Sequence, residues 1–146
     1  MKRALTYIES EVGLSHPDLT FTLSSLGTLY TSTGRYADAE EQYQRALTIL
    51  ESSPLDFETR IARLLHGLSA TYAKAGRKPE AEAALARAAT IARRNLKLHA
   101  DMATIIEDYS SSLNHQGKFK EAEELRVEAR RARVAAGLVT SARQPF

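Results

Sequence analysis

Two histidines and one glutamate come closest, in this sequence, to a set that could bind a metal ion or transfer a proton. They are His66, His115 and Glu107. No His-x-x-x-His pair and no paired-carboxylate motif accompanies them, and such motifs supply the ligands and proton carriers of most sites of this kind. We therefore expect no metal site and no catalytic residue.

Other residues that suggest chemistry lack the context that the chemistry needs. The serines at 110–112 have neither the flanking glycines nor the strand-to-helix turn of a nucleophile elbow. Gly34 and Gly76 are not followed by the Gly-Lys-Ser/Thr of a phosphate-binding loop. Four tyrosines fit helix packing better than a cofactor site: Tyr30, Tyr36, Tyr43 and Tyr72. We expect a protein that is not an enzyme and binds no cofactor.

Composition and charge exclude further classes. None of the 146 residues is cysteine, so disulfides, thiol nucleophiles and Cys-ligated zinc are absent. No apolar run approaches the roughly 18–20 residues of a membrane span, and the N-terminal residues do not resemble a signal peptide. Residues 1–63 carry a net charge of −3 and residues 64–146 one of +5, but almost no aromatic residue accompanies the late arginines. We expect a cytoplasmic protein that binds neither nucleic acid nor membrane.

One segment recurs three times along the chain. Gly34–Glu40 aligns without gaps with Gly76–Glu82 and Gly117–Glu123, at offsets of 42 and 41 residues. A partial copy opens the chain, because Arg3–Thr6 repeats Arg45–Thr48 at an offset of 42. The chain is therefore a set of repeated units, each too small to bury its own apolar face and stabilised by its neighbours.

The apolar residues of each unit have helical spacing. Leu23, Leu26 and Tyr30 lie at i, i+3 and i+7, and the second unit repeats this spacing. Pro17 fits a first helical turn and Asp56 a helix N-cap. No strand is expected, and helices are expected near residues 2–11, 17–33, 36–52, 57–75, 78–95, 100–116 and 119–136.

Small residues mark the turn between the two helices of each unit. The repeated glycine stands where the apolar pattern stops, which suits a left-handed residue that ends a helix. The alanine five residues later is small enough to let two antiparallel helices approach closely beside a short turn. These alanines are Ala39, Ala81 and Ala122.

The repeat resembles the tetratricopeptide repeat. Its Leu-Gly-x-x-Tyr step is present as Leu26, Gly27 and Tyr30, is partly kept as Leu68 and Tyr72, and diverges in the third unit. The long offset and the sequence His16-Pro17-Asp18 are similar to the kinesin light chain subtype. The residues that carry the resemblance are Leu26, Gly27, Tyr30, Gly34, Ala39, Leu68, Tyr72, Gly76, Ala81, Gly117 and Ala122.

The resemblance implies an all-α fold. It implies a right-handed α-solenoid of antiparallel helix hairpins with about seven helices, covering residues 1–136. The expected divisions are a half repeat at 1–15, repeats at about 16–55, 56–98 and 99–136, and a flexible tail at 137–146. Arg126 stands where earlier units have Tyr43 and Leu85, which suits a solvated C-terminal cap.

The resemblance also implies where a partner binds. In this family the first helices of successive units line a concave groove that takes extended peptides or helices. The equivalent residues here are Phe21, Ser24, Thr28 and Thr31, then Arg63, His66, Ala70, Ala73 and Lys74, then Thr104, Glu107, Ser111 and Asn114. This lining is small and polar. Capture of a C-terminal carboxylate is not expected, because Ser24 and Thr28 replace the charged residues and asparagines that perform it in the family.

Two functions stay open at this point. One is a non-catalytic scaffold that binds a peptide or helix of a partner protein in the groove. The other is a structural or oligomerisation segment of a longer array. The chain begins with the second helix of a unit, so its first apolar residues lack a packing partner. We expect it either to be cut from a longer array or to pair through this open edge with another chain, as in a homo-oligomer.

Overall fold

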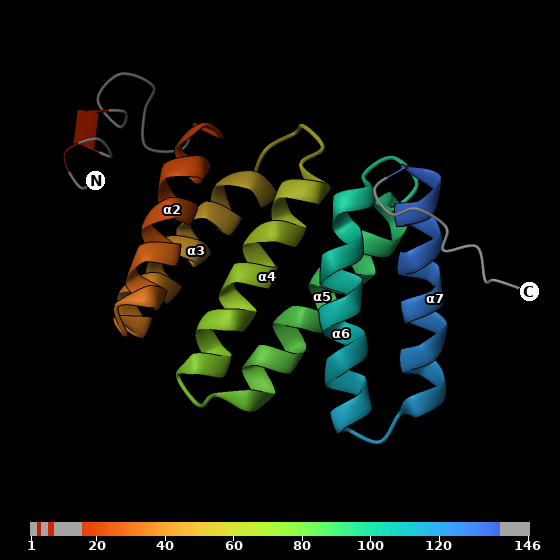
Figure 1. Cartoon of the computed structure of the whole chain (residues 1–146). Coiled ribbons are helices and arrows are strands. Elements are labelled where there is room, and N and C mark those ends of the chain that lie inside the picture. Colours follow the sequence, from red (N-terminus) through yellow and green to blue (C-terminus); the bar gives the residue numbers. More distant parts are fainter. Residues whose placement is uncertain (1–2, 4–5, 8–15, 138–146) are drawn as a thin grey trace, which may run out of the picture. The chain divides into compact units, whose positions relative to one another are not determined.

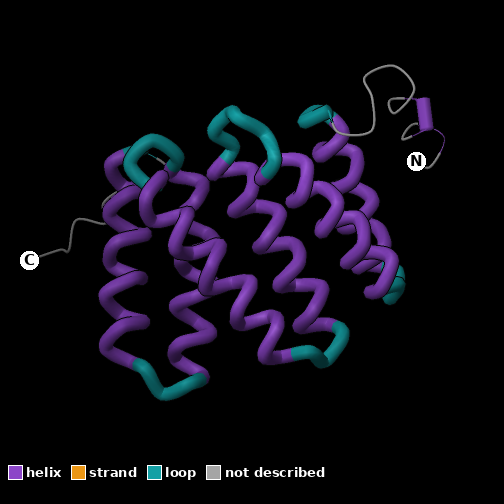
Figure 2. Tube along the Cα trace, turned by 180° about the vertical axis from the view of Figure 1, so that it is seen from behind, coloured by secondary structure: helices purple, strands orange, loops and turns teal. Residues whose placement is uncertain are grey.

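The computed structural model describes residues 3, 6–7 and 16–137, and the regular structure in them is helical. Figure 2 shows helices joined by loops, with no strand among the described residues. The predicted all-α class is therefore confirmed. Of the helix expected at 2–11 only Arg3, Thr6 and Tyr7 are described, and all three are helical. The rest of that helix, and the tail after Gly137, lie outside the described residues.

The chain divides into two compact units, residues 1–88 and 89–146, and each is described by itself. In the first unit, α3 (Tyr36–Glu51) packs against both α2 (Leu19–Ser32) and α4 (Glu58–Lys74) (Figure 1). Helix α5 (Lys78–Asn95) crosses the boundary between the units. In the second unit, a 3-10 turn, η1 (Ala100–Met102), leads into α6 (Ala103–His115), which pairs with α7 (Phe119–Ala135).

Two predicted helix starts are wrong by one or two residues. Helix α2 begins at Leu19, because Pro17 lies in a turn that the Leu19 amide closes by donating to the His16 carbonyl at 3.0 Å. Helix α4 begins at Glu58 with Phe57 at the cap position. Asp56 still supplies the expected acceptor, because its carboxylate accepts a hydrogen bond from the Glu58 amide at 3.0 Å. Its role is that of a capping side chain placed one residue early.

The repeated glycines follow the first helix of each of the three repeats. Gly34, Gly76 and Gly117 have φ of +75°, +79° and +78°, a left-handed conformation that costs glycine little. The residue after each glycine donates back into the last helical turn, as Arg35 does to the Tyr30 carbonyl at 2.8 Å. This pair of features reverses the chain within two or three residues and sets the hairpin.

In the first two repeats, an arginine after this glycine stacks on the tyrosine of the preceding helix. The Arg35 guanidinium lies 4.4 Å from the ring centre of Tyr30, and Arg77 lies 4.4 Å from that of Tyr72. A cation over an aromatic face contributes about 0.5–1 kcal/mol at an exposed site. It takes the place of the apolar contact that usually accompanies this type of helix end.

A small residue lies where α2 and α3 pack together in their hairpin. Leu26, Tyr30 and Ala39 form one buried cluster, and Ala39 has no exposed surface. Because Ala39 presents only a methyl group, the leucine and tyrosine of α2 can pack directly against the backbone of α3. Each large apolar side chain buried in this way contributes about 1.5–3 kcal/mol.

Tyr43 of α3 lies between two helical glycines. A Cβ atom added to Gly27 of α2 would lie 2.7 Å from the Tyr43 ring, and one added to Gly67 of α4 would lie 2.7 Å from its hydroxyl oxygen. The tyrosine therefore occupies the space that side chains at these two positions would fill. It joins α2, α3 and α4 around a single buried ring.

The core of the second unit mixes apolar and polar contacts. Ile106 and Leu113 of α6 and Leu125 of α7 are buried. Ser110 is also buried, and its hydroxyl donates to the Ala122 carbonyl at 2.8 Å. This hydrogen bond satisfies a buried hydroxyl and fixes α7 against α6 near their connecting turn.

Candidate partner-binding faces

Helices α2 and α4 lie next to each other. One predicted site residue, Thr31, is buried between them. Thr31 is buried, and its hydroxyl lies 2.8 Å from the hydroxyl of Thr71 in α4. The Thr31 hydroxyl also lies 2.8 Å from the Gly27 carbonyl, one turn earlier in α2. The prediction that Thr31 lines an exposed face is therefore wrong, because the side of α2 that contacts α4 is built from small and hydroxyl residues.

The other two small residues of α2 remain accessible. Ser24 is half-buried and Thr28 is exposed. The Thr28 hydroxyl lies 3.0 Å from the Ser24 carbonyl, to which only the threonine can donate, and 3.0 Å from the Tyr43 hydroxyl. Tyr43 is then the donor to Thr28. The Thr28 oxygen, on an exposed residue, keeps a lone pair that can accept a hydrogen bond from a ligand, whereas Tyr43 is buried.

Phe21 marks one end of this face. Its side chain is 64% exposed, and the Arg60 guanidinium lies 4.3 Å from its ring centre and 5.0 Å from that of Phe57. Arg60 also donates to the Pro17 carbonyl at 2.7 Å and to the Thr20 hydroxyl. These contacts fix the arginine, which then holds one side of the phenylalanine ring and leaves the other to solvent.

The face of α4 carries a basic residue at each end and exposed alanines between them. Ala70 and Ala73 are exposed, as are Arg63 and Lys74, while His66 is half-buried. The two cations lie eleven positions apart, about 16 Å along the helix at 1.5 Å per residue. A backbone can approach the helix near Ala70 and Ala73, because these exposed positions carry only a methyl group.

In the second unit, the equivalent face of α6 is partly occupied by α7. Thr104 and Ser111 are exposed, and Glu107 and Asn114 are half-buried. Arg133 of α7 donates to the Thr104 hydroxyl at 2.9 Å and to the Glu107 carboxylate at 2.8 Å. Two of the four candidates on α6 therefore hold the last turns of α7.

Arg133 is itself unusual for a surface cation. Its guanidinium is partly covered, and its Nε atom is buried without a hydrogen-bond partner among the described residues. Arg133 folds back over α6, and its ion pair with Glu107 offsets part of the cost of covering both charges.

A charged cluster joins the end of α4 to α3. The Tyr72 hydroxyl donates to Glu40 Oε1 at 2.7 Å, and Arg77 Nη1 donates to Glu40 Oε2 at 2.6 Å. Burial raises the pKa of Tyr72, and the hydrogen bond to the Glu40 carboxylate raises it further. The Arg77 guanidinium lowers the pKa of Glu80 through a second contact at 2.9 Å. The cluster links α3 to the end of α4 and to the first turn of α5.

The candidate metal and nucleophile residues have structural contacts. His66 belongs to the first unit, and Glu107 and His115 belong to the second. A ring nitrogen of His115 lies 2.7 Å from the Ser111 carbonyl, one turn earlier in the same helix. Among the described residues no three His, Asp or Glu side chains lie close enough to share a metal ion. The hydroxyl of Ser111 donates to the Glu107 carbonyl at 3.0 Å.

Comparison with protein families assigns most of the chain. Residues 1–52 and residues 61–99 each match a sequence profile described as tetratricopeptide repeat. The chain belongs to the tetratricopeptide repeat family. A search among curated proteins finds no match.

Two residues that contact the candidate face, Tyr43 and Arg60, were not predicted from the sequence of this tetratricopeptide repeat protein. Tyr43 belongs to the second helix of its repeat, yet its hydroxyl contacts the exposed Thr28 of α2, because Gly27 and Gly67 leave room for its ring. The signal for this was Gly67, since a glycine inside a helix costs about 1 kcal/mol relative to alanine unless packing requires it. Arg60 carried no such signal.

Within the described part of this repeat protein, no helix is long and apolar enough to cross a bilayer.

Proposed function

We propose that this tetratricopeptide repeat protein is a non-catalytic scaffold whose first-helix faces bind an extended peptide of a partner protein. Family membership supports the coarser statement, because these repeats generally mediate protein–protein interactions. The peptide would lie on α2 and α4 in the first unit, and α6 would offer the equivalent face in the second.

The observation that carries the proposal is the combination of small side chains on α2 and α4 with an exposed hydroxyl on α2. Ser24, Thr28 and Ala70 leave room for a peptide, and the exposed Thr28 hydroxyl, which accepts a hydrogen bond from Tyr43, keeps a second lone pair for a peptide amide. An extended peptide has one unpaired amide at every second residue on each side. A face of small side chains with a fixed acceptor suits such a ligand better than a bulky helix.

A finer family assignment goes with this proposal. The repeat offset of about 42 residues and the His16-Pro17-Asp18 sequence favour the kinesin light chain type of repeat. The absence of cysteine favours a reducing compartment, and we place the scaffold in the cytoplasm on that ground.

The test blocks the face with two arginines. Peptides selected from a displayed library of random peptides of about twelve residues would be titrated against the whole chain and against Thr28→Arg with Ala70→Arg. We expect the double variant to lose at least about tenfold in affinity, since each arginine fills space that the peptide needs. The matched control is Thr48→Arg with Ala83→Arg, because Thr48 is an exposed threonine with the same backbone hydrogen bond and Ala83 is an exposed alanine.

A structural or oligomerisation segment is the second candidate. Leu29 of α2 favours it, because this large apolar side chain is 44% exposed on a helix that begins the described array. Equal binding of the selected peptides to the native chain and to the double variant would count against groove binding. A molar mass above that of one chain in light scattering, together with that result, would favour the second candidate.

A further inference from the structure

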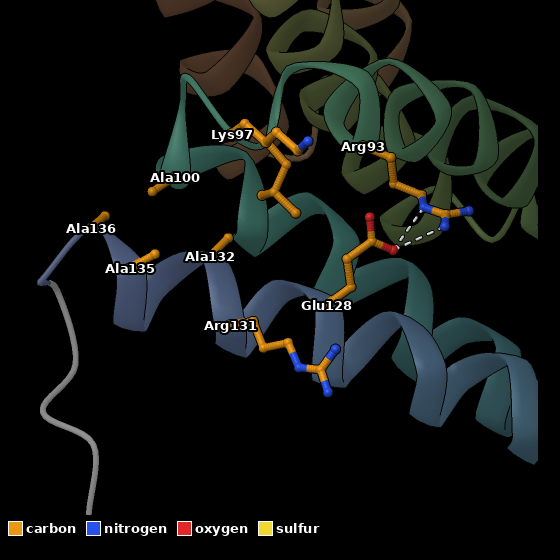
Figure 3. Close-up of a pocket in the computed structure, with 9 residues that line it drawn as sticks. Arg93, Lys97, Ala100, Glu128, Arg131, Ala132, Ala135 and Ala136 are labelled. Carbon is orange, nitrogen blue, oxygen red and sulfur yellow. Dashed lines mark hydrogen bonds and ion pairs between the residues drawn. The ribbon is translucent and has the colours of Figure 1, made fainter.

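A pocket of about 430 Å³ lies in the second unit, between the end of α5, the turn after it and the last turns of α7. Figure 3 shows Lys97 and Ala100 on one wall and Ala132, Ala135 and Ala136 on the other. The buried side chain of Leu96 also lines it. None of the residues that line this pocket belongs to α2, α4 or α6.

The pocket exists because the third repeat departs from the pattern of the first two. Ala132 aligns with Ile49 and Ile91 at the offsets of 42 and 41 residues. Both isoleucines are buried, at 6% and 8% exposure. Alanine lacks three of the four side-chain carbons of isoleucine, so the place of an aliphatic side chain is left open.

The charges around the pocket do not balance. Arg93 and Glu128 form an ion pair of 2.9 Å across one end, and Figure 3 shows this contact. Lys97 and Arg131 also line the pocket. Within the described part of the chain no carboxylate forms an ion pair with either of them. Two cations therefore stand beside an apolar space.

We propose that this pocket docks a partner polypeptide that places one aliphatic side chain against Leu96 and Ala132 and an adjacent carboxylate beside Lys97 or Arg131. Charge complementarity selects an acidic segment, and the vacant isoleucine position selects an aliphatic residue. The chain's own residues 138–146 are a poorer match, because they contain no aspartate or glutamate. The cations also interact with the negative ends of α5 and α7, so the test must separate a ligand from that local effect.

The probe is a short blocked peptide with the central sequence Glu-Leu-Asp, titrated into the whole chain while amide resonances are followed by NMR. We expect saturable shifts at Lys97, Ala132 and Ala135, with a dissociation constant in the millimolar range for one small anchor. Matched peptides with Gln-Leu-Asn or Glu-Ser-Asp at the centre remove the charges or the aliphatic group, and each should bind at least about fivefold more weakly.

Two variants of the protein test the two halves of the site. Ala132→Ile restores the residue of the other repeats, and it should weaken binding at least about tenfold while the helix content stays the same. Its control is Ala83→Ile, at an exposed alanine of α5 outside the pocket. Lys97→Gln keeps the inference testable if Ala132→Ile fails to fold, because Lys97 is exposed, and it should weaken binding about threefold or more.

Several results would overturn the proposal. Absence of saturable shifts, or equal binding of the charged and uncharged peptides, would remove the acidic ligand. Shifts of the same amides in a chain ended at Gly137, without peptide, would make the chain's own tail the occupant. Shifts that depend on protein concentration alone would assign the pocket to a second copy.

Discussion

The position of Tyr43 between two glycines allows a prediction whose sign is not obvious. In a helix interior, Gly→Ala is stabilising by about 1 kcal/mol, because alanine loses less backbone freedom on folding. At Gly67 of α4 the added Cβ would lie 2.7 Å from the Tyr43 hydroxyl oxygen and 2.8 Å from two ring carbons. The ring lies between two helices, since a Cβ built on Gly27 of α2 would also lie 2.7 Å from its other edge.

The expected magnitude follows from these two opposing terms. Overpacking a filled site costs about 1–3 kcal/mol. This cost equals or exceeds the gain of about 1 kcal/mol in helix propensity. Gly67→Ala should therefore lower the free energy of unfolding by about 0–2 kcal/mol. For a chain of this size, the melting temperature should fall by about 2–4 °C for each kcal/mol.

The assay is urea unfolding followed by circular dichroism, with two matched variants. Ala70→Gly measures the propensity difference in the same helix, because Ala70 is exposed one turn later. Tyr43→Leu removes the aromatic ring, and Gly67→Ala in that background should become stabilising. The double-mutant cycle should give a coupling of about 1–3 kcal/mol. If Gly67→Ala stabilises the native chain by the full amount that Ala70→Gly costs, the ring does not lie against Gly67 and the reasoning fails.

Two further predictions concern the hairpin and the charged cluster. Ala39→Trp should cost about 1–3 kcal/mol or more, because Ala39 has no exposed surface at the α2–α3 crossing; calorimetry against the exposed control Ala37→Trp checks this, and equal melting temperatures would contradict the hairpin packing. Burial raises the pKa of Tyr72 above the 10.0 of an unperturbed tyrosine, so the native state holds this proton more tightly and stability falls as the pH rises from about 10 through the native pKa. The stability gap between the native chain and Tyr72→Phe should therefore narrow above about pH 10 in urea unfolding, and a gap that stays constant there would show that the Tyr72 proton is not linked to folding.

The hairpins could be predicted from the sequence because their determinants are local. The glycine that ends α2 and the alanine that opens α3 are five residues apart. Each has a mechanical reason, a positive φ at Gly34 and a close crossing at Ala39, that needs no knowledge of the rest of the chain. Repetition at a fixed offset made the inference stronger, since three copies of one pattern rarely arise without a common structure.

The error at Thr31 shows where such reasoning stops. The apolar stripe of α2 marks only the side that packs on α3. The side toward α4 includes Thr20 and Thr31, whose partners Arg60 and Thr71 lie 40 residues further along the chain. Polar and small residues at an interface look like surface residues in a sequence, because their burial depends on partners that no local pattern identifies.

The third repeat extends this argument from packing to function. It departs from the first two repeats at several positions, among them Tyr109 for Leu26 and Leu68, Ala132 for Ile49 and Ile91, and Arg133 for Leu50 and Ala92. Stability alone favours an apolar side chain that fills the space at a buried position, so these replacements need a separate reason.

For Arg133 the structure supplies that reason in its contacts with Thr104 and Glu107, which hold α7 on α6. For Ala132 it supplies none within the described residues, because the space beside it stays open and two cations beside that space form no ion pair. A substitution that removes packing without a compensating contact is understandable if a ligand provides the contact. The departure from the repeat is therefore the best guide to where this scaffold differs from a simple spacer.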